Sequence, residues 1–350
     1  MTKKRFITYE TALNEALHQE MDRDKKVFVY GLDVADHKRI FGTTAGLVER
    51  FGPERCFSTP LSEDALTGFG LGAALNGFHP VQIHIRMDFI LLAMNQLVNM
   101  VSAYRYWTGG RVKVPFTIRA VIGRGWGQGA QHSKSLQSLF AHIPGLKVVM
   151  PTTPYDAKGL LVAAIRDDNP VLVIEHRWLY WQQGEVPKEQ FIIPLGQSHV
   201  LRGGSDITIV ATSWMNVEAS QAADILKKHR GIHVEIIDPR TLSPLDDKPI
   251  VRSVQKTGHC IIADHDWINC GFSAEVAARV AEKCFAALKS PVQRVAIPQT
   301  HCPTTRPLEN VFYPNARDIV RAVERALRLK PIDLSGENFY SHEHKFKGPF

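Results

Sequence analysis

The sequence has no hydrophobic run of the length that a membrane-spanning helix needs. Such a helix takes about 20 consecutive apolar residues, and every apolar stretch of this 350-residue chain meets a polar or charged residue sooner. The opening segment, MTKKRFITYE, also lacks the apolar core of a secretory signal. We therefore expect a soluble cytoplasmic protein without a membrane partner.

Cysteine is scarce as well. The five cysteines are scattered, and no two of them have the spacing of a metal site or a redox motif. They are expected to be small buried side chains in a reducing compartment. A disulfide-stabilised scaffold is therefore excluded.

The positive charge shows no clustering. The formal net charge is +7, but the basic residues are spread along the chain among 35 acidic ones. Nucleic-acid binding needs basic residues gathered on one face. The sequence therefore predicts an ordinary solvated surface and no nucleic-acid partner.

Strand and helix patterns alternate through the first half of the chain. Short β-branched runs predict strands at 27–33, 81–86, 116–123, 146–151 and 171–176, and apolar periodicity predicts helices from residue 62, at 89–104 and at 155–166. Alternation of this kind is typical of a parallel sheet covered on both faces. The expected fold class is α/β.

A second α/β unit follows a break in this rhythm. Residues 177–204 collect tryptophan, glutamine, proline and glycine, after which strands are predicted at 206–213, 233–238, 260–265 and 292–297. Helices are expected near 216–229, 273–288 and 316–328. The chain therefore divides into a first domain (1–185), a linker (186–204), a second domain (205–332) and a tail (333–350).

Two acids at the start of a glycine-rich helix draw attention. Glu63 and Asp64 in a first helical turn are ordinarily explained by the helix dipole. Gly68, Gly70 and Gly72 weaken that explanation, because each costs about 1 kcal/mol relative to alanine inside a helix. Another backbone or a cofactor is expected to pack against this helix.

The predicted strand at 81–86 carries polar residues on one face. Alternation places Gln82, His84 and Arg86 together. In a sheet covered on both sides, such a row indicates a cavity or an interface. Exposure at the end of the sheet is the alternative, and it suits Arg86 best; open α/β sheets bind ligands beyond those strand ends.

The segment GRGWGQGAQHSKS, residues 123–135, alternates four glycines and then presents His132. It lacks the lysine and hydroxyl residue of a phosphate-binding loop and the helix of a dinucleotide motif. A mobile surface loop and a loop that closes over a ligand both remain open, and His132 is either structural or catalytic.

Five ordered blocks carry a family resemblance: TPLSEDALTGFGLGAALNG, MDFILLAMNQLVN, YWTGGRVKVPFTIRA, GAQHSKSLQSLFAHIPGLKVVMPTTPYDAKGLLVAAIRDDNPV and VEIIDPRTLSPLD. Over about residues 5–330 the chain resembles the beta chain of the thiamine-diphosphate-dependent 2-oxo acid dehydrogenase first component, within the transketolase superfamily. The residues of these blocks are similar to those of the pyruvate, branched-chain and acetoin dehydrogenase beta chains. The resemblance implies a parallel-sheet pyrimidine-binding domain followed by a transketolase C-terminal-type α/β domain.

The resemblance also implies the roles of three residues. Glu63 would hydrogen-bond the aminopyrimidine ring of thiamine diphosphate, which helps a ring substituent take the proton from the thiazolium carbon. Phe89 would stack on the same ring. His132 would handle protons or orient substrate near the reacting carbon, and the preceding glycines would let the loop run close to that substrate.

A cation site is implied in the same way. The stretch AAIRDDNP resembles the monovalent-cation loop of the family, in which backbone carbonyls hold potassium. By position these carbonyls would belong to Phe116, Ala164, Asp167 and Asn169. A helix that ends in an Asp-Asn-Pro turn without an ion is the alternative.

One family motif is missing. The chain has no Gly-Asp-Gly followed by a downstream asparagine, the pattern with which the superfamily binds the cofactor's diphosphate through magnesium. The resemblance therefore implies that an alpha subunit holds the magnesium and shares the thiamine diphosphate in an α2β2 heterotetramer. The chain alone is expected to be inactive.

Some residues depart from the family pattern. Ile83 stands where relatives tend to carry glutamate, and His84, Arg86 and Arg124 are unusual around the substrate entry. We interpret the chain as a beta subunit that decarboxylates a pyruvate-like, branched-chain or acetoin-type substrate and passes the acyl group to a lipoyl transacylase, with a specialised anionic or polyhydroxylated substrate as a hypothesis. The alternatives are a thiamine-dependent carboligase acting on a sugar-derived substrate and a non-catalytic assembly subunit, which the retained trio disfavours.

Overall fold

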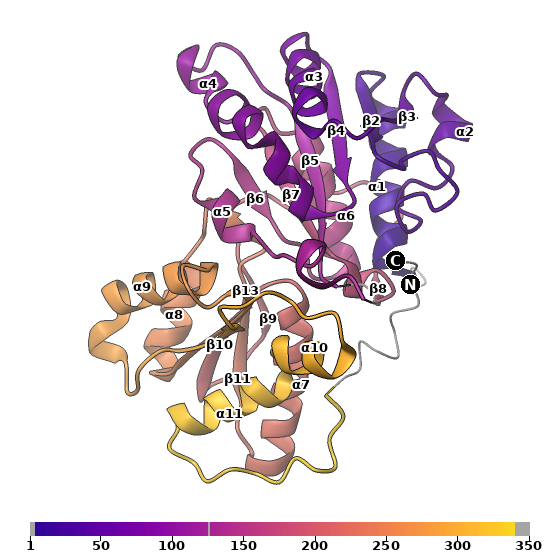
Figure 1. Ribbon diagram of the computed structural model, residues 1–350. Coiled ribbons are helices and arrows are strands. Elements are labelled where there is room, and N and C mark those ends of the chain that lie inside the picture. The colour runs from indigo at the N-terminus through magenta and orange to yellow at the C-terminus, as the bar shows by residue number, and fades with distance from the viewer. Residues whose placement is uncertain (1–3, 125–126, 340–350) are drawn as a thin grey trace.

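Two α/β units lie against each other in the computed structural model, which describes residues 4–124 and 127–339 (Figure 1). The expected α/β class is confirmed, because most neighbouring strands in both main sheets run parallel. Gly125, Trp126 and residues 340–350 of the predicted tail lie outside the described residues.

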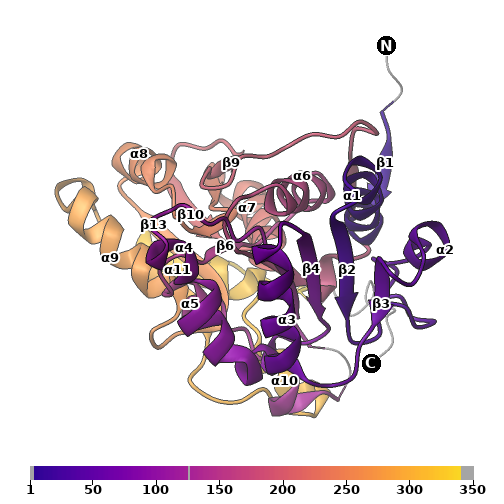
Figure 2. The ribbon, with the colours of Figure 1, turned by 90° about the horizontal axis from the view of Figure 1, so that it is seen from above.

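The first unit is built on a seven-stranded sheet with the order β12-β6-β7-β5-β4-β2-β3. Only β12 runs antiparallel to its neighbour. The strands are β2 (Val27–Gly31), β3 (Cys56–Ser58), β4 (His79–His84), β5 (Thr117–Ile122), β6 (Lys147–Val149), β7 (Val171–His176) and β12 (Thr241–Ser243). Figure 2 shows α1 (Tyr9–Arg23) and α6 (Pro154–Ile165) together on one side of this sheet and α3 (Glu63–Leu75) on the other.

Each face of this sheet has its own apolar core. Successive residues along a strand, such as Val121 and Ile122 of β5, join different clusters because their side chains point to opposite faces. Both faces are buried, which is why the strands read as nearly continuous apolar runs.

The second unit has a five-stranded sheet with the order β14-β13-β10-β11-β9. Its strands are β9 (His199–Arg202), β10 (Ile207–Ala211), β11 (Val234–Asp238), β13 (Cys260–Trp267) and β14 (Gln293–Ile297). The helices α7 (Trp214–Arg230) and α11 (Ala316–Ala326) pack together, as do α8 (Lys248–Thr257) and α9 (Phe272–Cys284). Only β9 runs antiparallel to its neighbour.

The remaining elements are short. A two-stranded antiparallel ribbon joins β1 (Phe6–Thr8) to β8 (Gln183–Glu185). The other helices are α2 (Leu47–Phe51), α4 (Tyr104–Trp107), α5 (Gln137–Ala141) and α10 (Arg306–Phe312), with single turns η3 (Gly129–Gln131), η4 (Arg177–Leu179) and η5 (Phe285–Ala287).

The boundaries between the units are less simple than the sequence predicts. β9 lies inside the expected linker and pairs with β11, while β12 leaves the second unit and pairs with β6 of the first. The predicted tail begins in the core, because Leu334 is buried and Phe339 is covered by the Arg317 guanidinium.

The helix predicted at 89–104 is not a single α-helix. The chain forms a 3-10 helix η1 (Met87–Ala93), a π-helix η2 (Asn95–Val101) and then α4. Changes of winding of this kind are frequent at functional sites. Here η1 carries Phe89 and Leu92, which line a cavity described below.

Two further expectations can be compared with the structure. No helix within residues 4–124 and 127–339 is long and apolar enough to cross a membrane. The five cysteines form no disulfide, and four of them are buried, but Cys270 is exposed, contrary to prediction.

Candidate active site

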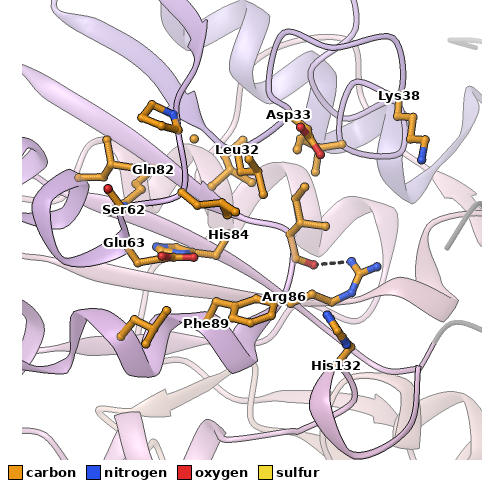
Figure 3. Close-up of a pocket in the computed structure, with 18 of the residues that line it drawn as sticks. Leu32, Asp33, Lys38, Ser62, Glu63, Gln82, His84, Arg86, Phe89 and His132 are labelled. Carbon is orange, nitrogen blue, oxygen red and sulfur yellow. Dashed lines mark hydrogen bonds between the residues drawn. The ribbon is translucent and has the colours of Figure 1, made fainter. Parts of the chain in front are cut away.

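A cavity of 480 Å³ opens at the carboxyl ends of β2 and β4. Its walls come from these strand ends, the start of α3, η1 and the loop that follows β2 (Figure 3). Five of the predicted site residues line it: Glu63, His84, Arg86, Phe89 and His132. Open α/β sheets bind ligands at this kind of edge.

Glu63 is the first residue of α3, and two contacts fix that helix. The Tyr30 hydroxyl donates to the Leu66 carbonyl at 2.9 Å, and the Thr67 hydroxyl donates to Gln82 Oε1 of β4 at 3.1 Å. Ser62 occupies the N-cap position, but its side chain makes no capping hydrogen bond. Glu63 is half-buried and directed at the cavity.

The glycines of α3 serve different surfaces. A Cβ at Gly70 would lie 2.2 Å from the Tyr30 hydroxyl and 2.4 Å from the Phe116 ring, so the close neighbours there are side chains of the chain itself and not the expected backbone or cofactor. A Cβ at Gly72 would meet no atom within 4 Å. This side of α3 leaves its backbone open to a neighbour from outside the chain.

Phe89 and His132 meet across the cavity. Their ring centroids are 5.3 Å apart in an edge-on arrangement. The loop that carries His132 is fastened to η1, because Lys134 Nζ pairs with Asp88 Oδ1 at 3.1 Å and the Lys134 backbone N–H donates to the same oxygen at 3.3 Å. This pair holds the imidazole beside the ring.

His84 and Arg86 are buried, so the exposed alternative for Arg86 is wrong. His84 Nε2 and Arg86 Nε have no hydrogen-bond partner among the described residues, although both side chains line the cavity. Burial lowers the pKa of His84 to about 4, which keeps its imidazole neutral at pH 7. These two buried polar atoms are therefore available to form hydrogen bonds with a ligand in the cavity.

Three arginines follow the carboxyl ends of three adjacent parallel strands. Arg86 follows β4, Arg124 follows β5 and Arg177 follows β7. Arg124 does not line the cavity: its guanidinium pairs with Glu309 of α10 at 2.9 Å and lies over the Trp178 ring. Arg124 therefore contacts the second unit, and it does not reach the cavity in which a substrate contact was hypothesised.

The glycine-rich loop packs against both units. Gly123 and Gly129 have positive φ angles of 85° and 54°. A Cβ would lie 2.6 Å from the His176 ring at the first and 2.5 Å from Thr304 Cγ2 at the second. These two glycines admit close packing of side chains, and only His132 beyond them reaches the cavity.

The predicted cation loop is held by side-chain cations of the chain itself. Lys147 Nζ pairs with Asp167 Oδ2 at 2.5 Å, and Arg105 donates to the Asp168 carbonyl at 3.1 Å and to Asn169 Oδ1 at 3.0 Å. The Phe116 carbonyl accepts the Val171 N–H, and the Ala164 carbonyl accepts the Asp167 N–H. These contacts favour the turn alternative.

One wall of the cavity, formed by the loop after β2, was not predicted from the sequence. Asp33, Lys38, Ile40 and Phe41, from the loop after β2, line it. Their stretch carries no periodic pattern; only its position after a buried strand could have indicated the site.

Comparison with known proteins identifies the family. The transketolase pyrimidine-binding domain matches residues 5–182, and the transketolase C-terminal domain matches residues 196–319. The chain is 40% identical to the beta subunit of the acetoin:2,6-dichlorophenolindophenol oxidoreductase of Cupriavidus necator, covering 93% of this chain and 98% of that one. It is also 40% identical to the beta subunits of the pyruvate dehydrogenase E1 component and of 2-oxoisovalerate dehydrogenase from Bacillus subtilis, over 92% of this chain and 99% and 98% of theirs.

The chain belongs to the beta subunits of the thiamine-diphosphate-dependent 2-oxo acid dehydrogenases. A solved split-gene transketolase, described as an inactive β4 tetramer, matches this beta subunit with a TM-score of 0.75 and 25% identity, covering 93% of this chain and 99% of that one. Membership in the family implies work with thiamine diphosphate and an alpha subunit.

Proposed function

We propose that this beta subunit supplies half of an active site that oxidatively decarboxylates a 2-oxo acid and passes the acyl group to a lipoyl transacylase. The observation that carries the proposal is the convergence of Glu63, Phe89 and His132 on one cavity. Acid, aromatic ring and imidazole are the groups needed to hold a polar heterocycle and move protons beside it.

The cavity fits the pyrimidine half of thiamine diphosphate. Glu63 would share a proton between its carboxyl group and a ring nitrogen, Phe89 would offer a ring face, and the unsatisfied Nε2 of His84 would add a polar contact in the same space. When bound, the cofactor supplies the electron sink for decarboxylation. The chain's own residues orient the ring, hold a proton at the Glu63 carboxyl group and place the His132 imidazole at the opposite side.

An alpha subunit is the partner that completes the site. Leu61 and Leu92 line the cavity mouth yet are 69% and 62% exposed, and Phe69 on α3 is half-exposed. With the open backbone at Gly72 they form an apolar rim. Exposed apolar rims of this kind mark protein interfaces, and an α2β2 heterotetramer would cover this one.

The metal half of the cofactor site belongs to that partner. No group of three or more histidine, cysteine, aspartate or glutamate residues suited to a metal ion occurs in the part of the chain that the structure describes. We assign magnesium and the diphosphate to the alpha subunit, because this chain lacks the Gly-Asp-Gly motif that the family resemblance leads us to expect for them. Potassium at the carbonyls of Phe116, Ala164, Asp167 and Asn169 stays a prediction.

The test is co-expression with a candidate alpha chain, followed by oxidation assays with 2,6-dichlorophenolindophenol as the electron acceptor. Pyruvate, 3-methyl-2-oxobutanoate and acetoin cover the substrates named for the relatives. We expect thiamine-dependent turnover that needs both chains and a further acyl transfer when a lipoyl transacylase is added. A thiamine-binding complex that joins 2-oxo acids to aldehydes and reduces no acceptor would favour the carboligase instead.

A further inference from the structure

Arg86 is a buried cation without a matching acid. Its side chain is 8% exposed, and its only hydrogen bond within the described residues runs from Nη1 to the Ile85 carbonyl at 2.8 Å. The carboxylate whose charge opposes the lowering of the Arg86 pKa by burial, Asp88, is already paired with Lys134. Buried charges are normally paired, so a missing partner at Arg86 has to come from elsewhere.

A second arginine lies close to the first. The Arg177 guanidinium is 4.8 Å from the centroid of the Phe41 ring, and that of Arg86 is 6.0 Å from the same centroid. Burial together with the charge of Arg86 lowers the pKa of Arg177 to about 9. Two like charges in this surrounding repel each other, and an anion beside Arg86 would relieve the repulsion.

The aromatic residue between them is held by an unusual turn. Arg39, Ile40 and Phe41 all have positive φ angles, of 48°, 48° and 59°. Consecutive left-handed residues without glycine cost free energy, and such conformations persist mainly where function requires them. The turn places the Phe41 ring in the cavity wall, where it packs against the Tyr180 ring. The guanidinium groups of Arg86 and Arg177 both lie over the Phe41 ring.

The two ends of the cavity are chemically different. In Figure 3, Ser62, Glu63 and Gln82 lie toward one end, and Arg86 lies beside His132 toward the other. The first end carries the acid expected at the cofactor ring. The second end carries two cations, Arg86 and Lys38, and one carboxylate, Asp33, and is reached by the imidazole that would face substrate.

We propose that Arg86, supported by Phe41 and Arg177, binds a second anionic group of the substrate, so that the enzyme prefers 2-oxo acids whose far end carries a carboxylate or a phosphate. This inference rests on the proposed function. The carboxylate next to the ketone leaves as carbon dioxide, and a strong contact with it would stabilise the ground state more than the transition state. A retained anion is therefore the better partner for Arg86.

The experiment compares substrates of equal length in the complete complex with its alpha subunit. 2-Oxoglutarate and 2-oxopentanoate differ in the far carboxylate alone, and a phosphorylated 2-oxo acid of similar length distinguishes phosphate from carboxylate. Arg86→Gln is expected to lower kcat/KM for the preferred anionic substrate about 30-fold, the loss of one charge-assisted contact. It should leave 2-oxopentanoate within about threefold.

Two further variants keep the result interpretable. Arg86→Lys retains the charge and should restore part of the preference, which a mere folding defect would not do. Arg252→Gln removes an arginine from an exposed position on α8 and should change neither substrate.

Specific results would overturn the proposal. One is a wild-type complex that uses 2-oxopentanoate as well as both anionic substrates. Another is an Arg86→Gln complex in which pyruvate and 2-oxoglutarate lose the same factor, because Arg86 would then hold the reacting carboxylate. Calorimetric binding of the same compounds to a Glu63→Gln complex, with and without Arg86→Gln, gives a second readout. If the wild-type complex oxidises no 2-oxo acid, the proposed function fails. The anion site is then still decided by whether binding of the anionic compounds depends on Arg86.

Discussion

The two ends of the cavity differ in how far their residues could be predicted from the sequence. Glu63 and Phe89 lie at positions that match the family resemblance, whereas Arg86 departs from it and Phe41 was not predicted from the sequence. The first end is formed by a helix start and a 3-10 turn, and the second by a left-handed turn and buried guanidinium groups. Within one cavity, the cofactor end follows shared chemistry and the substrate end follows this chain's own packing.

The largest expected effect lies at the cofactor end. Glu63→Gln should lower oxidation of every substrate by about 100-fold or more, because in the proposed function Glu63 is the acid that moves a proton at the cofactor ring. Asp64→Asn is the matched control, since Asp64 is exposed, outside the cavity lining and bonded to Gln96. Steady-state rates of the two complexes decide; equal losses would remove Glu63 from its role.

The next effect concerns the neutral imidazole between the two ends. Burial places the folded pKa of His84, about 4, below its ordinary value of 6.5. The unfolded chain therefore takes up the proton first, so stability is complete above pH 6.5 and is lost as the pH falls toward 4. Between pH 7 and 5, His84→Gln should lose about 2 kcal/mol less stability than the wild type.

Urea unfolding at the two pH values measures this difference. His142→Gln, at an exposed histidine, is the control and should follow the wild type. Identical pH dependence in His84→Gln and the wild type would contradict the burial argument.

A smaller effect is expected outside the cavity. Gly72→Leu should weaken association with the alpha subunit about tenfold, because the side chain would stand on an open helix surface. The isolated chain should gain rather than lose stability, since leucine favours a helix more than glycine does. Sedimentation and thermal unfolding separate these two results; unchanged association would place the partner elsewhere.

The smallest effect is expected far from both ends. Replacing potassium by sodium should change the melting temperature by less than about 2 °C. The reason is that Lys147 already pairs with the Asp167 carboxylate and Arg105 already donates to the Asp168 carbonyl in the loop at 164–169. A larger shift that is specific for potassium would restore the ion site at Phe116 and Ala164.

Much of the fold could be predicted because its signals are periodic. The strands at 81–86 and 171–176 and the helix at 155–166 were readable from apolar runs, and polar alternation in β4 indicated the cavity wall. The path of β12 was not readable, because three residues before a proline carry no period. Phe41 was missed for a similar reason: its place depends on backbone angles that the stretch KRIFGTT does not encode in any pattern.

The crossing of β12 limits how this molecule can move. Thr241 and Ser243 extend the sheet of the first unit, and the Met150 N–H donates to the Arg240 carbonyl at 2.8 Å beside them. A hinge between the units would have to break this pairing and would expose a bare sheet edge, which invites aggregation. A hinge motion between the units is therefore unfavourable, and a chain cut at the linker would lose the strand that closes its first sheet.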